Sequence, residues 1–110
     1  MSMVDRIFVV RLTGELDIGR KTEIRQALSE PGDAPAVLLD LSEVTYADSI
    51  ALTELLRFCA DAQRDQRPVA LVIKTPQFAR LVQYAGLSDA FTTFDDTSAA
   101  LAYLAESLAQ

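Results

Sequence analysis

The chain has 110 residues, 50% of them hydrophobic and 24% charged, a composition typical of one globular domain with a single core over residues 1–110. Its net charge of −6 disfavours nucleic-acid binding, because a phosphate backbone would be repelled. Histidine is absent, which removes the commonest general base and metal ligand, so we expect no enzyme, no metal site and no cofactor.

The first predicted elements are a strand and a helix. Residues 7–12 form an apolar run with one charge, which is typical of a buried or half-buried strand. Thr13-Gly14 breaks this run, and residues 15–17 are expected to form a brief second strand or a turn. A helix is predicted from about 20 to 29, followed by a surface loop rich in turn-forming residues over 30–35. Helical spacing assigns three residues to the inner face of this helix: Ile24, Ala27 and Leu28.

The middle of the chain is predicted to form a strand, a loop and a long helix. Residues 36–41 are almost continuously apolar, which indicates a strand covered on both faces. Residues 42–47 are expected to be the connecting loop, in which Val44 and Tyr46 mainly pack. The helix is predicted from 50 to about 66. Its core face is expected to carry Leu52, Leu55, Leu56, Cys59, Ala62 and Gln63.

Asp48 and Ser49 stand where the predicted loop passes into this helix. The first backbone N–H groups of a helix have no internal partners, and the helix dipole places partial positive charge there. Either residue can act simply as the helix cap, and a serine at this point can also accept a phosphate. Off or at the edge of the predicted core face lie four residues that form an expected docking surface: Ile50, Ala51, Glu54 and Phe58.

The last third of the chain repeats the alternation of strand and helix. Pro68 opens a strand over 69–73, and Thr75-Pro76 starts a helix that Gly86-Leu87 ends. A short edge strand is predicted over 91–94, and Asp96-Thr97 caps a final helix. The alternation predicts an α/β layer fold, and spacing alone favours a fully parallel, flavodoxin-like sheet. Apolar residues at helical spacing mark the core faces of these two helices: Phe78, Leu81, Val82 and Ala85 in the first, Leu101, Leu104 and Leu108 in the second.

The stretch LLDLSEVTYADSIALTELL resembles the central signature of the STAS domain family, in particular of bacterial anti-sigma factor antagonists. The family has an Asp-Ser-Ser-Gly run here, whose first serine is phosphorylated. In this chain the run is Asp48-Ser49-Ile50-Ala51, so the aspartate and first serine match while the second serine and glycine do not. LTGELD, ending at Asp17, is similar to a second family segment, and the resemblance implies that this aspartate lies beside Ser49. Tyr84-Ala85-Gly86-Leu87 provides a third, looser match.

The resemblance implies a STAS-like fold, with a small mixed sheet of four to five strands and about four helices. It also implies a protein that binds an anti-sigma factor, itself an ATP-dependent serine kinase, and thereby frees a sigma factor. Phosphorylation of Ser49, with Asp17 and Asp48 as neighbours, would end this binding. A serine phosphatase would restore it. Whether the chain acts alone or as a homodimer is left open.

Two other functions are considered. The domain could be a constitutive STAS scaffold or an accessory subunit of a transport or stress-signalling complex, without phospho-regulation. It could also be an acid–base enzyme using Asp17 and Asp48, since two close carboxylates raise the pKa of one of them. The sequence shows no signal peptide, lipidation motif or apolar run long enough to span a membrane, and its single cysteine indicates a reducing compartment. We therefore expect a cytoplasmic protein.

Overall fold

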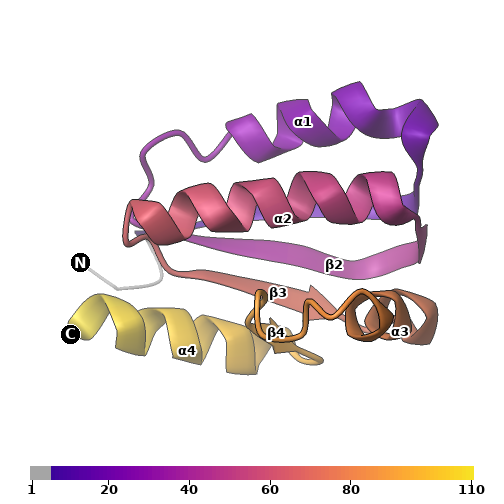
Figure 1. Cartoon of the computed structure of the whole chain (residues 1–110). Coiled ribbons are helices and arrows are strands. Elements are labelled where there is room, and N and C mark those ends of the chain that lie inside the picture. Colours follow the sequence, from indigo (N-terminus) through magenta and orange to yellow (C-terminus); the bar gives the residue numbers. More distant parts are fainter. Residues whose placement is uncertain (1–5) are drawn as a thin grey trace.

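A computed structural model describes residues 6–110 as four strands and four α-helices that alternate along the chain (Figure 1). A short 3-10 helix, Ile18–Arg20, precedes the first α-helix. The elements are β1 (Ile7–Leu16), α1 (Lys21–Ser29), β2 (Ala36–Ala47), α2 (Ser49–Arg64), β3 (Val69–Ile73), α3 (Pro76–Tyr84), β4 (Thr93–Phe94) and α4 (Thr97–Ala109).

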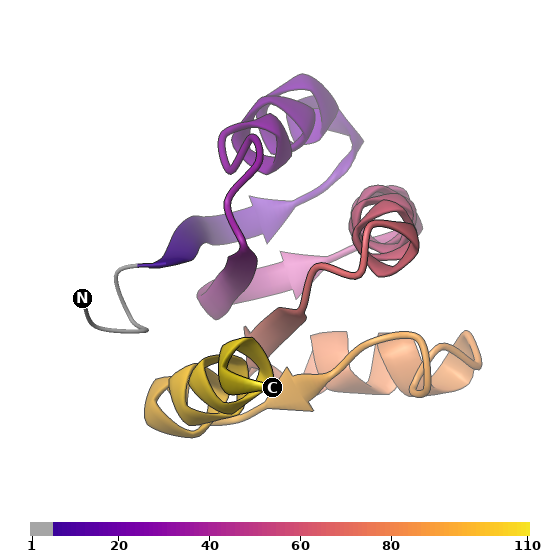
Figure 2. The same cartoon turned by 90° about the vertical axis from the view of Figure 1, so that its left-hand side faces the viewer.

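The four strands form one sheet in the order β1-β2-β3-β4. Each connection therefore moves the chain one position in the same direction, and right-handed crossovers then place all three intervening helices on one face. Figure 2 shows α1, α2 and α3 on one side of the sheet and α4 on the other. This arrangement confirms the predicted α/β domain and the cover on both faces of β2.

All three strand pairings within residues 6–110 are parallel. The mixed sheet implied by the family resemblance is therefore wrong for this part of the chain. The parallel sheet predicted from spacing is confirmed. The cause is that a helix follows each of β1, β2 and β3 and returns the chain to the same end of the sheet before the next strand begins.

Side-chain alternation along β2 divides the core in two. Val37, Leu39 and Leu41 face the cluster beneath α1, α2 and α3, whereas Ala36 and Leu38 face the cluster beneath α4. Ala100 and Leu104 supply the buried contacts from α4. The five β2 residues named above have no exposed surface, so the first half of this strand is the centre of the domain.

The predicted break at Thr13-Gly14 and the predicted loop over 42–47 are both wrong. These two stretches pair with each other, so β1 continues to Leu16 and β2 to Ala47. The register shifts on either side of Thr13 and Gly14, and Gly14 has φ +77°, a conformation in which glycine is free of strain. An irregular strand pair with exposed polar residues has no strict alternation, which is why the pattern is that of a loop.

Most helix boundaries and core faces are close to the prediction. The end of α3 is a Schellman motif: Leu87 donates to the Val82 carbonyl at 3.1 Å, and Gly86, with φ +73°, donates to that of Gln83 at 3.0 Å. Gln63 and Ala85, both expected on core faces, are exposed instead. Gln63 lines an open cavity of about 410 Å³, together with Tyr103 of α4.

No helix in the described part of the chain is long and apolar enough to cross a membrane.

Candidate functional site

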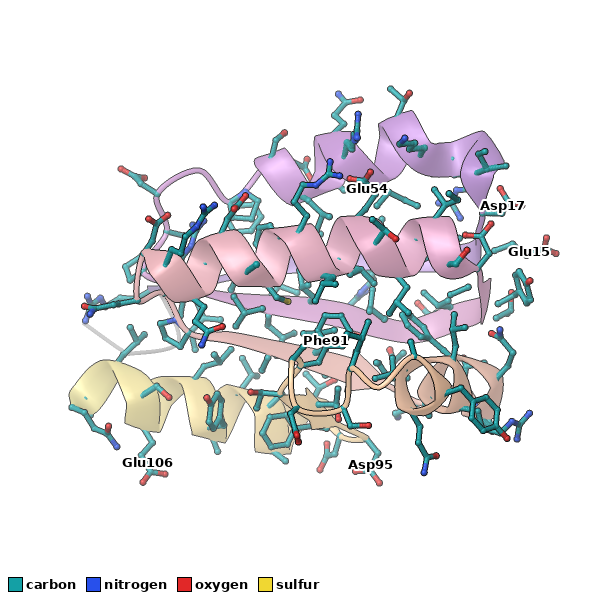
Figure 3. All side chains as sticks on the ribbon, in the orientation of Figure 1. Glu15, Asp17, Glu54, Phe91, Asp95 and Glu106 are labelled. Atoms are coloured by element: carbon teal, nitrogen blue, oxygen red, sulfur yellow. The ribbon has the colours of Figure 1, made fainter. Side chains whose placement is uncertain are left out.

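The ends of β1 and β2 bring the two candidate aspartates to the same corner of the domain. Leu16 and Ala47 form the last pair of the strand ladder. The next backbone group, the Asp48 N–H, donates to the Leu16 carbonyl at 3.0 Å. Asp17 and Asp48 therefore leave paired strands together, and Figure 3 shows Asp17 at the N-terminal end of α2.

Asp48 caps α2. Its backbone is extended, and its Oδ1 accepts hydrogen bonds from the N–H groups of Ile50 and Ala51, both at 3.0 Å. These bonds satisfy two of the N–H groups that the helix itself leaves without a partner. The predicted cap is thus Asp48 and not Ser49.

Ser49 is the first residue of α2 and is exposed to solvent. Its carbonyl accepts from the Thr53 hydroxyl at 2.8 Å. Within residues 6–110 its own hydroxyl forms no hydrogen bond, so this oxygen is free to react or to meet a partner. The helix start depends on Asp48, and a change at the Ser49 hydroxyl leaves the cap in place.

Asp17 is also a cap. Its Oδ1 accepts from the Gly19 N–H at 3.0 Å and begins the short 3-10 helix. A side chain at position 19 would be crowded, because a Cβ there would lie 3.2 Å from this oxygen. Asp17 is half-buried. Its hydrogen bond to Gly19 fixes the carboxylate at the corner shared with Asp48.

Sequence reasoning missed a clamp from α3 that holds the end of β2. β3 ends at Ile73, which pairs with Leu41, so the rest of β2 has no strand on that side. Gln77 replaces it: its Nε2 donates to the Ala47 carbonyl at 2.9 Å, and its Oε1 accepts from the Ala47 N–H at 3.1 Å. The Thr75 hydroxyl donates to the Val44 carbonyl in the same way. The residue directly before Asp48 is therefore held from two sides.

The expected docking surface on α2 is only partly present. Ile50 and Phe58 are half-buried, but Ala51 has no exposed surface and Glu54 is 5% exposed. The prediction for these last two is wrong because α2 packs against α1 as well as the sheet, so more than one side of the helix is buried. Tyr46, expected to pack, is 44% exposed.

Ile18 is 68% exposed, directly after Asp17, and was not singled out from the sequence. It provides apolar surface beside the 3-10 helix, next to the corner that holds the candidate aspartates. In the sequence, the position of this large apolar residue directly after a candidate acidic cap would have indicated an exposed apolar side chain at the corner.

Glu54 is held by arginines from two helices. Arg25 Nε on α1 lies 3.0 Å from both carboxylate oxygens, and Arg57 Nη1 on α2 lies 3.9 Å from Oε2. The hydrogen bond from Arg25 lowers the pKa of Glu54 below its usual 4.5, although burial acts in the opposite direction. Glu54 is thus ionised at neutral pH and ties α1 to α2.

Cys59 is the remaining candidate for reactivity, and its environment suppresses it. Burial raises the pKa of its thiol to about 12, so the nucleophilic thiolate is scarce at neutral pH. The described residues also contain no group of three or more acidic or cysteine side chains arranged to hold a metal ion.

Comparison with known proteins gives a family match and structural neighbours. A family model described as STAS domain matches residues 1–100. An anti-sigma factor antagonist from Mycobacterium paratuberculosis is 24% identical with a TM-score of 0.83, and the match covers 91% of this chain and 86% of that chain. Among curated protein sequences, none matches significantly.

Two further solved structures are similar. A sulfate transporter family protein from Wolinella succinogenes is 15% identical with a TM-score of 0.78, covering 96% of this chain and 89% of that chain. The phosphorylated form of SpoIIAA, a Bacillus cell fate determinant, is 20% identical with a TM-score of 0.67, covering 90% and 91%. At these identities the structural likeness shows the fold alone.

Proposed function

Because the chain belongs to the STAS domain family, we propose that it is a cytoplasmic anti-sigma factor antagonist whose binding to an anti-sigma factor kinase ends when Ser49 is phosphorylated. The observation that carries this proposal is the exposed, unbonded hydroxyl of Ser49 at the start of α2. Structural neighbours that are anti-sigma factor antagonists, and one solved in a phosphorylated form, support it.

The site explains how a phosphate could change binding without unfolding the domain. The cap of α2 is formed by Asp48 and the strand end is held by Gln77, so neither depends on the Ser49 hydroxyl. A phosphate adds a charge of about −1.5 to −2 at neutral pH. The fold therefore tolerates the modification.

The same phosphate would crowd the docking corner with negative charge. Asp48 already occupies the N–H groups of Ile50 and Ala51, so those two donors are not available to the phosphate, and the helix dipole compensates only part of its charge. Asp17 and Asp48 stand at the same corner. A partner surface that is acidic or apolar would then meet an uncompensated charge, which weakens the complex.

The direct test is phosphorylation by the cognate anti-sigma kinase. The protein is incubated with the kinase and ATP, and the phosphate is located by mass spectrometry. We expect one site, Ser49, and removal of the label by a serine phosphatase. Ser98 is a matched control, because it is an exposed serine in the first turn of α4 behind the Asp96 cap. Unchanged phosphate incorporation in Ser49→Ala would reject the proposal.

A second candidate is a constitutive STAS scaffold or accessory subunit. The similarity to a sulfate transporter family protein favours it. In that case Ser49 could be replaced by alanine or aspartate with no effect on partner binding. The acid–base enzyme has less support, because Asp17 and Asp48 each use an oxygen to cap a helix.

A further inference from the structure

The first half of β1 forms a free edge of the sheet. Within residues 6–110, β1 pairs with β2 on one side and has no strand on the other, as Figure 2 shows. β4, the strand at the opposite edge, has only two residues and is too short to pair with another chain. An edge strand presents a row of backbone N–H and C=O groups, so the partner that it selects is another extended chain.

The ladder between β1, β2 and β3 shows which backbone groups of β1 point outward. The Val37 N–H donates at 3.1 Å to the carbonyl directly before β3, so the next residue, Leu38, turns its backbone groups toward β1. Leu38 lies opposite Val9 in a parallel register. In such a register Leu38 bonds to the two neighbours of Val9, and Val9 itself points its N–H and C=O away from β2. By the same alternation, residues 7 and 11 point outward as well.

Only the second half of this edge is protected. There Arg20 Nη1 donates to the carbonyls of Thr13 and Glu15, at 2.6 and 2.9 Å, and so occupies two outward acceptors. The first half, residues 7–11, contains no proline, lysine or bulge. Its side chains Phe8 and Val9 are 37% and 46% exposed. Because proteins normally protect a free edge by such features, the unprotected half is a candidate site of strand pairing.

We propose that two copies of this chain pair through residues 7–11 of β1, antiparallel about a two-fold axis at Val9. In this register Val9 lies opposite Val9 of the second copy, and Ile7 lies opposite Arg11. Each outward residue then exchanges both backbone hydrogen bonds with the residue opposite it. The exposed ring of Phe8 lies opposite Val10 of the second copy and gains apolar cover.

The local charges select a second copy in this register. Residues 7–11 carry one charge, Arg11, whose Nε lies 3.1 Å from the Asp40 carboxylate of the same chain. Antiparallel pairing places Arg11 opposite Ile7 and not opposite a second arginine, so no like charges meet directly. The second copy also offers a free stretch of the same length with the same outward groups. These features make the edge complementary to itself.

The net charge determines how this association responds to salt. Each copy carries −6, so the two copies repel at long range, and salt screens that repulsion. Self-association should therefore become stronger as the salt concentration rises. A complex held by opposite charges would respond in the opposite way.

The interface is small and lies away from Ser49. Pairing of one short stretch buries less than the roughly 1,200 Å² of a standard stable interface, so the dimer should be weak and reversible. Val9 lies seven residues before Leu16, about 23 Å along the strand from the corner of Asp17 and Asp48. The inference therefore goes beyond the proposed switch and does not depend on it. Ser49→Asp should leave self-association unchanged.

Amide hydrogen exchange of the full chain, measured by NMR at low and high protein concentration, tests the register. At low concentration the outward amides of residues 7, 9 and 11 should exchange fast, whereas those of residues 8 and 10 are protected by β2. At high concentration exchange at 7, 9 and 11 should slow by about two- to tenfold, as the monomer fraction falls. Residues 8 and 10 should change little. Exchange at 7, 9 and 11 that is independent of concentration would overturn the proposal.

Two substitutions at Val9 test the edge by sedimentation equilibrium. Val9→Lys places like charges opposite each other at the two-fold axis. Val9→Pro removes an outward N–H that β2 does not use. Both should weaken self-association by about fivefold or more. Tyr84→Lys is the matched control, because Tyr84 is 82% exposed at the end of α3 and the charge changes equally. It should associate as wild type does.

Three results would contradict pairing of two copies at this edge. The first is equal self-association of Val9→Lys and wild type. The second is self-association that weakens as salt is added. The third is protection of the amides of residues 7, 9 and 11 in dilute protein only when the anti-sigma factor is added, which would assign the edge to a strand of that partner.

Discussion

At the scale of single residues, Asp48 and Ser49 have different structural roles at the start of α2. Asp48 accepts two backbone hydrogen bonds and so fixes where α2 begins, while Ser49 presents an exposed hydroxyl one residue later. Sequence spacing left open which of the two is the cap. The geometry assigns it to Asp48, so the proposed phosphorylation of Ser49 would not compete with capping.

We therefore expect Ser49→Asp to abolish binding to the anti-sigma factor without unfolding the domain. The substituted carboxylate adds negative charge beside Asp17 and Asp48, but it lies on the surface in the first helical turn, where the dipole favours an acid. The free energy of unfolding should stay within about 1 kcal/mol of wild type. Urea unfolding and a pull-down assay measure the two effects, and Ser98→Asp is the control. Full affinity in Ser49→Asp would contradict the switch.

At the scale of elements, α3 and α1 both contribute to the site without carrying a residue of the signature. Gln77 of α3 and Thr75, the N-cap of this helix, donate hydrogen bonds to the part of β2 that β3 does not reach. α1 lends Arg25 to Glu54. These contacts join residues about 30 positions apart. A pattern read along one element does not contain them, so the sequence did not predict them.

Gln77→Ala should loosen the end of β2 directly before Asp48. It leaves the N–H and carbonyl of Ala47 without their partners, which costs about 1–3 kcal/mol. Hydrogen exchange at the Ala47 amide should become faster. Gln83→Ala, an exposed glutamine of the same helix, is expected to change neither quantity. Slow exchange at Ala47 in the Gln77 variant would show that the clamp is dispensable.

The pairing of α1 with α2 should depend on Arg25 far more than on Arg57. Removal of Arg25 leaves the carboxylate of Glu54, only 5% exposed, without its two 3.0 Å bonds. We expect Arg25→Ala to destabilise the domain by about 1–3 kcal/mol. Arg57→Ala removes a contact of 3.9 Å and should cost no more than about 0.5 kcal/mol. Thermal or urea unfolding of the two variants decides this, and equal losses would contradict the assignment.

At the scale of the whole molecule, alternation of strands and helices was enough to predict the α/β layers, because amphipathic periodicity depends on the face each element buries. It did not predict that residues 42–47 belong to β2, because their partners are the irregular residues 13–16. Nor did it predict that Glu54 is buried, because a helix with two neighbours buries two faces. For the candidate site, the sequence and its family resemblance singled out Asp17, Asp48 and Ser49, and these residues lie near one another because the paired strands β1 and β2 end side by side.

Two buried carboxylates connect the stability of the whole domain to pH. Asp40 loses hydration on burial, which alone would raise its pKa, but hydrogen bonds from Ser42 and Arg11 outweigh this and hold its pKa below the usual 3.8. The pKa of Glu54 is likewise held below 4.5. In both cases the unfolded chain binds protons more readily than the folded domain.

Their contribution to stability is therefore complete well above pH 4.5 and is lost as the pH falls through the lowered pKa values of the folded state. We expect the free energy of unfolding, measured in urea, to be nearly constant from about pH 7 to 6 and to decrease steadily below about pH 5. Glu54→Gln should be less stable than wild type at neutral pH and should lose less on acidification, because one of the two groups no longer titrates. Exposed Glu106→Gln is the control and should keep the wild-type slope. A Glu54→Gln variant with an unchanged pH dependence would mean that the buried ion pair does not couple to folding.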